Sequence, residues 1–91
     1  MSYNTVIRKI IEKQEDTIGR IALQKVQSIE GINVEGSETD LAENLGKEDL
    51  EELMDIFKQI QGQGAVGIAR NAISDISDEE LEGLDLPEEL E

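Results

Sequence analysis

The sequence contains no cysteine and no histidine, and its only aromatic residues are Tyr3 and Phe57. Without cysteine, disulfides and thiolate sites are excluded. So few aromatic rings leave little that stacks on a nucleobase or lines an aromatic cofactor pocket. Acidic pairs such as Glu51 and Asp55, four residues apart, are typical of exposed helix charge, and no stretch has the spacing of an EF-hand loop. We therefore expect no enzymatic activity, no cofactor, and no catalytic or metal-binding residues.

Long apolar runs are also lacking. No stretch approaches the 18 or so apolar residues of a membrane-spanning helix, and the first residues lack the apolar segment of a signal peptide. Basic residues are scarce, since 8 Lys and Arg stand against 22 Asp and Glu, a formal net charge of −14. Such a chain repels phosphate backbones and anionic membranes. We expect a soluble cytoplasmic protein whose partners include neither nucleic acid nor membrane.

The acidic charge is unevenly distributed along the chain. Residues 1–30 contain five basic and four acidic residues, a net charge of +1, so that the rest of the chain carries −15. Residues 75–91 contain nine acidic residues and no basic one. One interpretation is an adaptation for solubility or for high internal salt. The other is an acidic segment that docks on a basic partner.

Apolar residues recur at spacings of three, four and seven between Ile7 and Ile29, which predicts an amphipathic helix over residues 3–29. A straight helix of that length would measure about 40 Å, whereas a compact chain of this size is about 30 Å across. Either the helix breaks near Asp16, Thr17, Ile18 and Gly19, or it projects and packs on another subunit. The break is the simpler expectation for a monomer, because glycine weakens a helix by about 1 kcal/mol relative to alanine.

The second half of the chain contains clearer helix signals. An apolar stripe with acidic residues at its start and Lys58 near its end predicts a helix over Lys47–Gln61. After a glycine-rich break, a second helix is predicted over residues 65–75. Ser77 begins a capping box that predicts a short acidic helix ending at Gly83. The residues beyond Gly83 alternate apolar and acidic types, and we expect them to be flexible.

The segment between the two halves predicts little regular structure. One short strand is expected at Ile32, Asn33 and Val34, which alternate between two glycines. The next residues look like the cap of a short helical turn that Gly46 ends, with the cap formed by Ser37, Glu38, Thr39 and Asp40.

Taken together, these elements predict an all-α fold, a small bundle or orthogonal array of four to five helices with one minor strand. The expected organisation is a helical domain over residues 1–76 followed by an acidic C-terminal segment over residues 77–91. The expected core consists of Ile7, Ile10, Ile11, Ile18, Ile21, Ala22, Ile29, Leu50, Leu53, Met54, Phe57, Ile60, Ile68, Ala69, Ile73 and Ile76.

A weak internal repeat connects the two halves. An offset of 47 residues pairs four identical residues, namely Gln14, Ile21, Ala22 and Ile29 with Gln61, Ile68, Ala69 and Ile76. If it is a true repeat, the chain contains two helix–break–helix units, with the first break at residues 16–18.

The glycines after the Lys47–Gln61 helix form a literal G-x-G-x-x-G pattern, the type that lets a backbone approach a pyrophosphate at a helix start. Here a helix and not a strand precedes the pattern, which favours a glycine-rich hinge between two helices. The remaining functional interpretation is an anion site at the start of the second helix. Its candidate residues are Gly62, Gly64, Gly67 and Arg70.

The run Leu45-Gly46-Lys47-Glu48-Asp49-Leu50 and the acidic helix after it resemble the attachment region of acyl carrier proteins. In that family, a serine between an acid and a leucine at a helix start carries the phosphopantetheine arm. Asp49 occupies that position here and has no hydroxyl for the arm. The resemblance therefore implies only an acidic helix that basic partners bind.

These patterns lead to two functional hypotheses. The first is a non-enzymatic protein-interaction or regulatory module that binds a basic protein partner or self-associates through its near-neutral first helix. The alternative is a small-ligand or anion-binding domain that uses the hinge at residues 62–67 and the helix start that follows.

Overall fold

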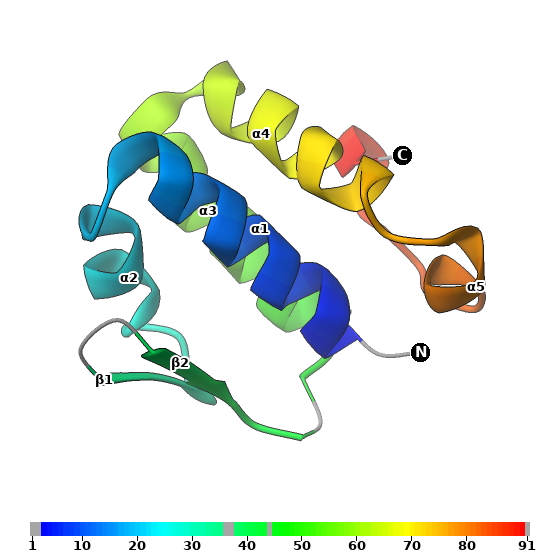
Figure 1. Ribbon diagram of the computed structural model, residues 1–91, viewed down its shortest axis with the longest axis horizontal. Coiled ribbons are helices and arrows are strands. Elements are labelled where there is room, and N and C mark those ends of the chain that lie inside the picture. The colour runs from blue at the N-terminus through cyan, green and yellow to red at the C-terminus, as the bar shows by residue number, and fades with distance from the viewer. Residues whose placement is uncertain (1–2, 36–37, 44, 91) are drawn as a thin grey trace.

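The computed structural model describes residues 3–35, 38–43 and 45–90, and it shows a helical array with one small β-hairpin (Figure 1). This confirms the predicted fold class. In chain order the elements are α1 (Tyr3–Ile18), α2 (Ile21–Val26), β1 (Ile32–Glu35), β2 (Glu38–Leu41), α3 (Lys47–Gln61), α4 (Gln63–Ser74), α5 (Asp78–Leu81) and the 3-10 turn η1 (Glu88–Leu90).

The first predicted helix is broken, as its length required. Gly19 adopts a left-handed conformation (φ +73°), and its N–H donates to the carbonyl of Glu15 over 2.8 Å, which ends α1. The chain then turns back into α2, so that the two helices pack against each other (Figure 1). The resulting molecule measures 31 × 28 × 20 Å, with a radius of gyration of 11.9 Å.

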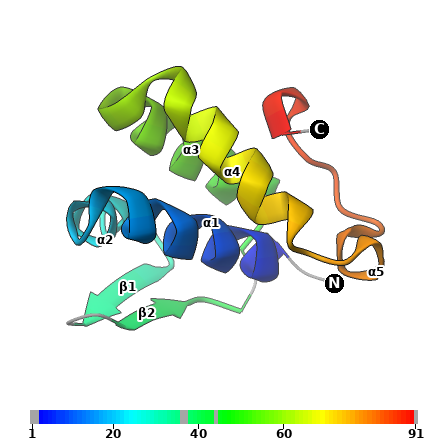
Figure 2. The same ribbon diagram turned by 45° about the horizontal axis from the view of Figure 1, so that its top comes forward.

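The second half of the fold is the α3–α4 helix pair. The carboxylate of Asp49 accepts the Gly46 N–H over 2.8 Å at the start of α3, and the helix follows the predicted bounds. Gly62 (φ +62°) then turns the chain into α4, which begins at Gln63, two residues before its predicted start. Helix α4 packs on both α1 and α3 (Figure 2).

The helical turn predicted around residues 38–46 is wrong, because Glu38–Leu41 forms a strand. This strand, β2, pairs antiparallel with β1, with Ile32 opposite Leu41. Because paired residues share a face, Val34 and Thr39 lie on the same side as that pair, and the hairpin packs this side over α1 and α2 (Figure 1). Strand pairing and packing against the helices thus override the local sequence pattern that favoured a helix cap. The cap predicted at Ser37 lies outside the described residues.

One core fills the space between the helices and the hairpin. Twelve of the sixteen predicted core residues are buried, but Ile18, Ile60 and Ile68 are half-buried and Ile21 is 43% exposed. Ile21 was misplaced because Gly19 rotates the chain between α1 and α2, so the apolar stripe of α1 does not continue in phase. Core residues absent from the prediction are Val6, Leu23, Val26, Ile32, Leu45, Ala65, Ala72 and Leu90.

A buried polar contact joins α1 to the turn between α3 and α4. Gln14 is fully buried within the apolar face of α1. Its Oε1 accepts the Gln61 amide over 2.8 Å, and its Nε2 donates to the Ala65 carbonyl over 3.4 Å. Because these bonds satisfy both ends of the amide, the core tolerates a polar side chain there.

Candidate functional site

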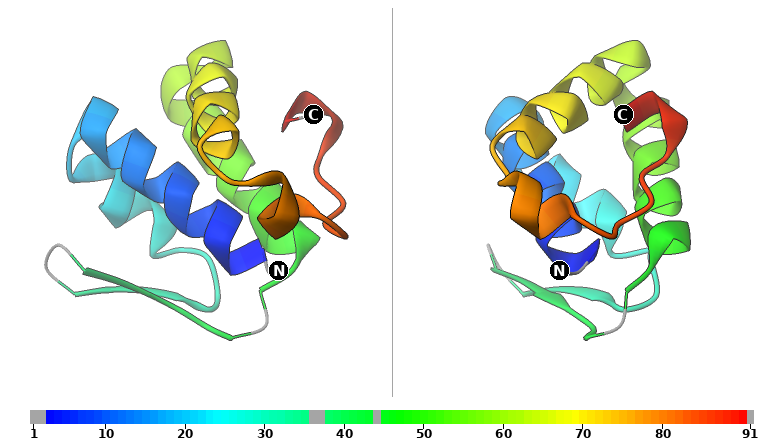
Figure 3. Two further views of the ribbon diagram at one scale, coloured as in Figure 1. Left: turned by 45° about the vertical axis from the view of Figure 1, so that its right-hand side comes forward. Right: turned by 90° about the vertical axis from the view of Figure 1, so that its right-hand side faces the viewer.

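The acidic C-terminal segment folds back onto the helices. Ser77 accepts the Glu80 N–H at the start of α5, and Gly83 (φ +84°) follows the helix, which confirms the predicted short helix. Residues 84–90, which we call the C-terminal strap, then run back beside α3 and α4 (Figure 3). Pro87 is buried and Leu90 is 3% exposed within the core. The flexibility predicted for these residues concerns motion and stays a prediction.

Scarce cations hold the strap in place. Residues 31–91 contain three basic side chains, and all three contact the strap. Lys47 pairs with the Asp85 carboxylate over 3.0 Å, and Lys58 pairs with the Glu89 carboxylate over 2.6 Å. The Nε of Arg70 donates to the carbonyl of Glu89 over 3.0 Å. The positive charge of this half of the molecule is therefore concentrated along one peptide segment.

The single tyrosine of the chain supplies a further anchor. The hydroxyl of Tyr3 donates to the Asp85 carbonyl and accepts the Asp85 N–H, each over 3.0 Å. The two bonds bind the backbone at the start of the strap to the first turn of α1. The strap is thus fixed at both ends, by Tyr3 near α1 and by Leu90 in the core.

The carboxylates of the strap raise the pKa values of the two lysines that they contact. The hydrogen bond with Asp85 raises the pKa of Lys47 above its ordinary value of 10.5, although partial desolvation opposes the change. The hydrogen bond with Glu89 likewise raises the pKa of Lys58. The charge of Glu51 adds to the rise in the pKa of Lys47, and the charge of Asp55 adds to the rise in the pKa of Lys58.

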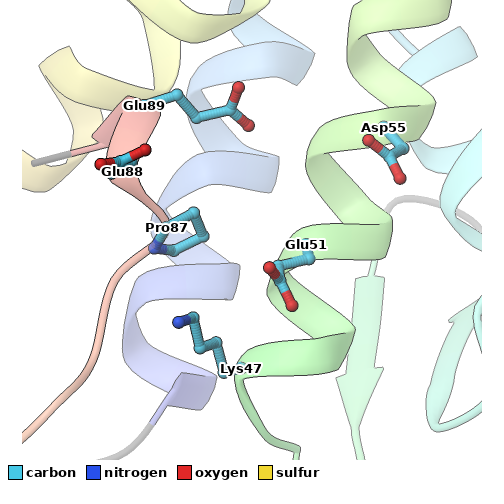
Figure 4. A pocket seen from close by; sticks show the side chains of 6 residues that line it. All are labelled: Lys47, Glu51, Asp55, Pro87, Glu88 and Glu89. Carbon is cyan, nitrogen blue, oxygen red and sulfur yellow. The ribbon is translucent and has the colours of Figure 1, made fainter.

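Between α3 and the strap lies an open groove of about 870 Å³, which we call the acidic groove. One wall is formed by α3 and the other by the strap (Figure 4). Glu51 and Asp55 extend from α3 into the groove, and Glu89 extends toward α3 from the opposite wall. The full set of lining residues is Lys47, Glu51, Asp55, Pro87, Glu88 and Glu89.

The acidic groove has an excess of negative charge that its own lysine does not balance. Lys47 is engaged by Asp85, and Glu89 is engaged by Lys58. Within the part of the chain that the structure describes, Glu51, Asp55 and Glu88 form no salt bridge. A concave surface lined by unpaired charges of one sign raises the local concentration of ligands of the opposite sign. The groove is therefore suited to a cationic ligand.

The described residues contain neither a metal-binding cluster nor a membrane-spanning helix. Across residues 3–35, 38–43 and 45–90, no three acidic side chains come together in a group able to hold a metal ion. Within the same ranges, no helix combines the length and the apolar content needed to cross a bilayer.

The structure separates the residues of the predicted anion site. Gly62 lies at the start of α4 and Gly64 lies in its first turn, whereas Gly67 is exposed in the middle of the helix. Arg70 lies about 12 Å from Gly62 along the helix axis and binds the strap. Gly62 and Gly64 thus lie close together at the start of α4, whereas Arg70, the fourth candidate residue of the anion site, lies away from them. The anion site stays a prediction.

The first helix, predicted as a self-association surface, uses its apolar face inside the molecule. Val6, Ile7, Ile10 and Ile11 are buried, and α1 packs on α2, α3 and α4. The exposed residues of α1 are polar or charged, whereas Ile21 of α2, which belonged to the same predicted helix, is 43% exposed. Self-association through this helix also stays a prediction.

Comparison of the chain with protein-family models, with curated proteins and with solved structures found no match. Sequence reasoning had singled out Glu51 and Asp55 only as ordinary exposed charge, and it missed the strap. Two signals pointed to the strap, namely the three isolated cations in an acidic half and the leucines that alternate with acids after Gly83.

Proposed function

We propose that this protein is a non-enzymatic interaction module that binds a basic segment of a partner protein in the acidic groove. The observation that supports the proposal is the presence of carboxylates on both walls, from α3 and from the strap. A ligand between these walls contacts negative charge on two sides. The groove is open to solvent and has carboxylates on two walls, which suits a peptide segment better than a single ion.

The spacing of the carboxylates favours an extended partner segment. Glu51 and Asp55 are four residues apart on α3, so they are separated by about 6 Å along the helix axis. Alternate residues of an extended chain point to the same side about 6.5–7 Å apart. A segment in which every second residue is lysine or arginine therefore places one cation near each of these two carboxylates.

The overall charge supports the same class of partner. A net charge of −14 attracts a basic segment over long range and raises the rate of encounter, an effect that falls as salt is added. The half-buried Lys47 and Lys58 are occupied by the strap, so they offer little competing attraction for acidic ligands. Affinity in the groove is therefore expected to depend strongly on ionic strength.

Fluorescence anisotropy with a labelled peptide of alternating lysine and serine tests the proposal. The double variant Glu51→Gln/Asp55→Asn removes the two charges of the α3 wall, and we expect it to bind about tenfold more weakly, which corresponds to about 1.4 kcal/mol. The matched control is Glu12→Gln/Asp16→Asn, an equally spaced exposed acidic pair on α1. This control reduces the net negative charge by the same amount and should retain nearly full affinity.

Comparing the affinities of the two variants distinguishes binding in the acidic groove from a general effect of net charge. Equal loss of affinity in both would show that the peptide responds only to net charge, and the proposal would then be abandoned. Amide shifts in the wild-type protein give the location directly. They should concentrate on α3 and the strap, and shifts spread evenly over α1, α2 and the hairpin would also contradict a specific groove.

A further inference from the structure

The C-terminal strap is held as a bound peptide would be held. Its backbone is fixed by Tyr3 at one end, its carboxylates meet Lys47 and Lys58, and its last apolar side chain, Leu90, inserts into the core. A glycine with a left-handed backbone, Gly83, separates it from α5. The strap is thus joined to α5 through a glycine and is held by both side-chain and backbone anchors.

The charges around the strap both attract and repel it. Asp85, Glu88 and Glu89 make it anionic, and the α3 wall opposite carries Glu51 and Asp55. The pairs that hold it are partly exposed to solvent, with side-chain exposures of 37% and 74% for Lys47 and Asp85 and of 33% and 31% for Lys58 and Glu89. Ion pairs at such exposure are individually weak. The strap is therefore expected to open without unfolding of the helices.

We propose that the face of α3 and α4 beneath the strap is a receptor site for acidic peptides, and that the strap is its displaceable internal ligand. The site offers three cations, Lys47, Lys58 and Arg70, and a core position that takes a leucine. Its ligand is an acidic segment of another protein, with carboxylates spaced like Asp85 and Glu89 and a leucine directly after the second. In the resting molecule the internal ligand masks this site.

Displacement of the strap has a consequence for the acidic groove. The strap forms one wall of that groove, so an acidic peptide that replaces it removes Glu88 and Glu89 from the site of the basic partner. The bound peptide then supplies this wall with its own carboxylates, so the two sites are linked through one movable segment. This inference goes beyond the proposed function, because the receptor site recognises ligands of the opposite charge.

Binding of a labelled peptide with the sequence of residues 84–91 to the full-length chain tests the receptor site. In the wild type the internal strap competes at an effective concentration in the millimolar range. The variant Glu89→Gln/Leu90→Ala weakens the attachment of the strap and leaves the receptor face intact. Because the strap then competes less, we expect this variant to bind the peptide at least tenfold more tightly than the wild type does. Adding Lys58→Glu to this variant should abolish binding. Adding Lys25→Glu on α2 instead should change it little, because among the described residues no salt bridge or side-chain hydrogen bond joins Lys25 to the strap.

Two outcomes would overturn the inference. One is that the Glu89→Gln/Leu90→Ala variant fails to bind peptide at millimolar concentration while circular dichroism shows it folded. The other is that Lys58→Glu and Lys25→Glu have equal effects on binding.

Amide exchange of the wild type gives a second test that needs no variant. The Asp85 and Leu90 N–H groups, bonded to Tyr3 Oη and to the Pro87 carbonyl, should exchange faster than those of Met54 and Phe57 in α3 and respond little to dilute urea. If the N–H groups of the strap and those of α3 exchanged at one common, urea-dependent rate, the strap would open only when the whole protein unfolds. The inference would then fail.

Discussion

At the scale of single residues, Gly31 has the least room for a side chain among the glycines that the structure describes. It has a φ of +93°, and an added Cβ would lie 2.9 Å from Leu45 Cδ2 and 3.3 Å from Ala42 Cβ. Its carbonyl also accepts the Ala42 N–H over 2.7 Å, which closes the hairpin. We expect Gly31→Ala to destabilise the protein by about 1–3 kcal/mol, because it combines a left-handed backbone with a steric clash. Urea denaturation followed by circular dichroism measures the change.

The matched control is Gly67→Ala on α4. Gly67 has no positive φ, and an added Cβ would meet nothing within 4 Å. Alanine is the better helix former, so this substitution should stabilise the protein by roughly 0.5–1 kcal/mol. Should both substitutions destabilise the protein equally, the backbone conformation assigned to Gly31 would be in error.

At the scale of elements, the pair between Lys58 on α3 and Glu89 on the strap is predicted to be a specific contact. Lys58→Glu places a carboxylate against Glu89 and close to Asp55, so we expect the melting temperature to fall by a few degrees. Exchanging the charges in Lys58→Glu/Glu89→Lys should restore part of the loss, because the pair is re-formed while the repulsion from Asp55 remains. A thermal double-mutant cycle measures the coupling. If the two effects simply add, the contact between these side chains contributes nothing.

How far the sequence predicted these elements depended on whether the signals were local. The bounds of α3 were predicted correctly, because an uninterrupted apolar stripe, an acidic first turn and flanking glycines all lie within the segment itself. Strand β2 was not predicted, because its stability comes from pairing with β1 and from covering α1, neither of which a local pattern contains. The acidic groove was missed for the same reason, since its walls come from α3 and the strap, far apart in the chain.

The internal repeat stays a prediction, and the positions of two glycines in the structure suggest a second register for it. Gly19 and Gly62, both with positive φ, end α1 and α3, and they are 43 residues apart instead of 47. The difference of four residues is close to one helical turn, so both offsets superimpose apolar faces and periodicity alone does not distinguish them. At an offset of 43, buried residues also match, with Ile7, Ile10, Ile11, Gln14, Ala22, Val26 and Ile29 on Leu50, Leu53, Met54, Phe57, Ala65, Ala69 and Ala72.

At the scale of the whole molecule, stability is expected to fall at alkaline pH. The pKa values of Lys47 and Lys58 are raised in the folded state above their ordinary value of 10.5, chiefly by the hydrogen bonds to Asp85 and Glu89. A raised lysine pKa contributes stability that is fully present below the unfolded value and is lost as pH rises through the folded value. Urea midpoints measured from pH 8 to 11.5 should therefore decline above about 10.5. The variant Lys47→Gln/Lys58→Gln should decline less steeply, and an identical profile would show that these two lysines are not the cause.

The net charge of −14 makes a prediction about salt in which two effects compete. Among the described residues, three salt bridges at 2.6–3.0 Å favour the fold, and their side chains are between 31% and 74% exposed, so screening costs little stability. At low salt, repulsion among the excess carboxylates acts across a molecule of 31 × 28 × 20 Å. These dimensions exceed the screening length of about 8 Å at 0.15 M, so added salt removes much of this repulsion. Since the repulsion is long-range and concerns many more charges, it should dominate, and sodium chloride should raise the melting temperature.

Thermal melts between 10 and 500 mM sodium chloride decide the matter, and a control separates screening from ion-specific effects. The variant Glu12→Gln/Asp16→Asn removes two exposed charges outside the groove, so its melting temperature should start higher at low salt and rise less steeply. A melting temperature that falls with salt would mean that the strap pairs outweigh the general repulsion. In that case the acidity would be arranged mainly to hold the strap, and the acidic groove would be a secondary feature of that arrangement.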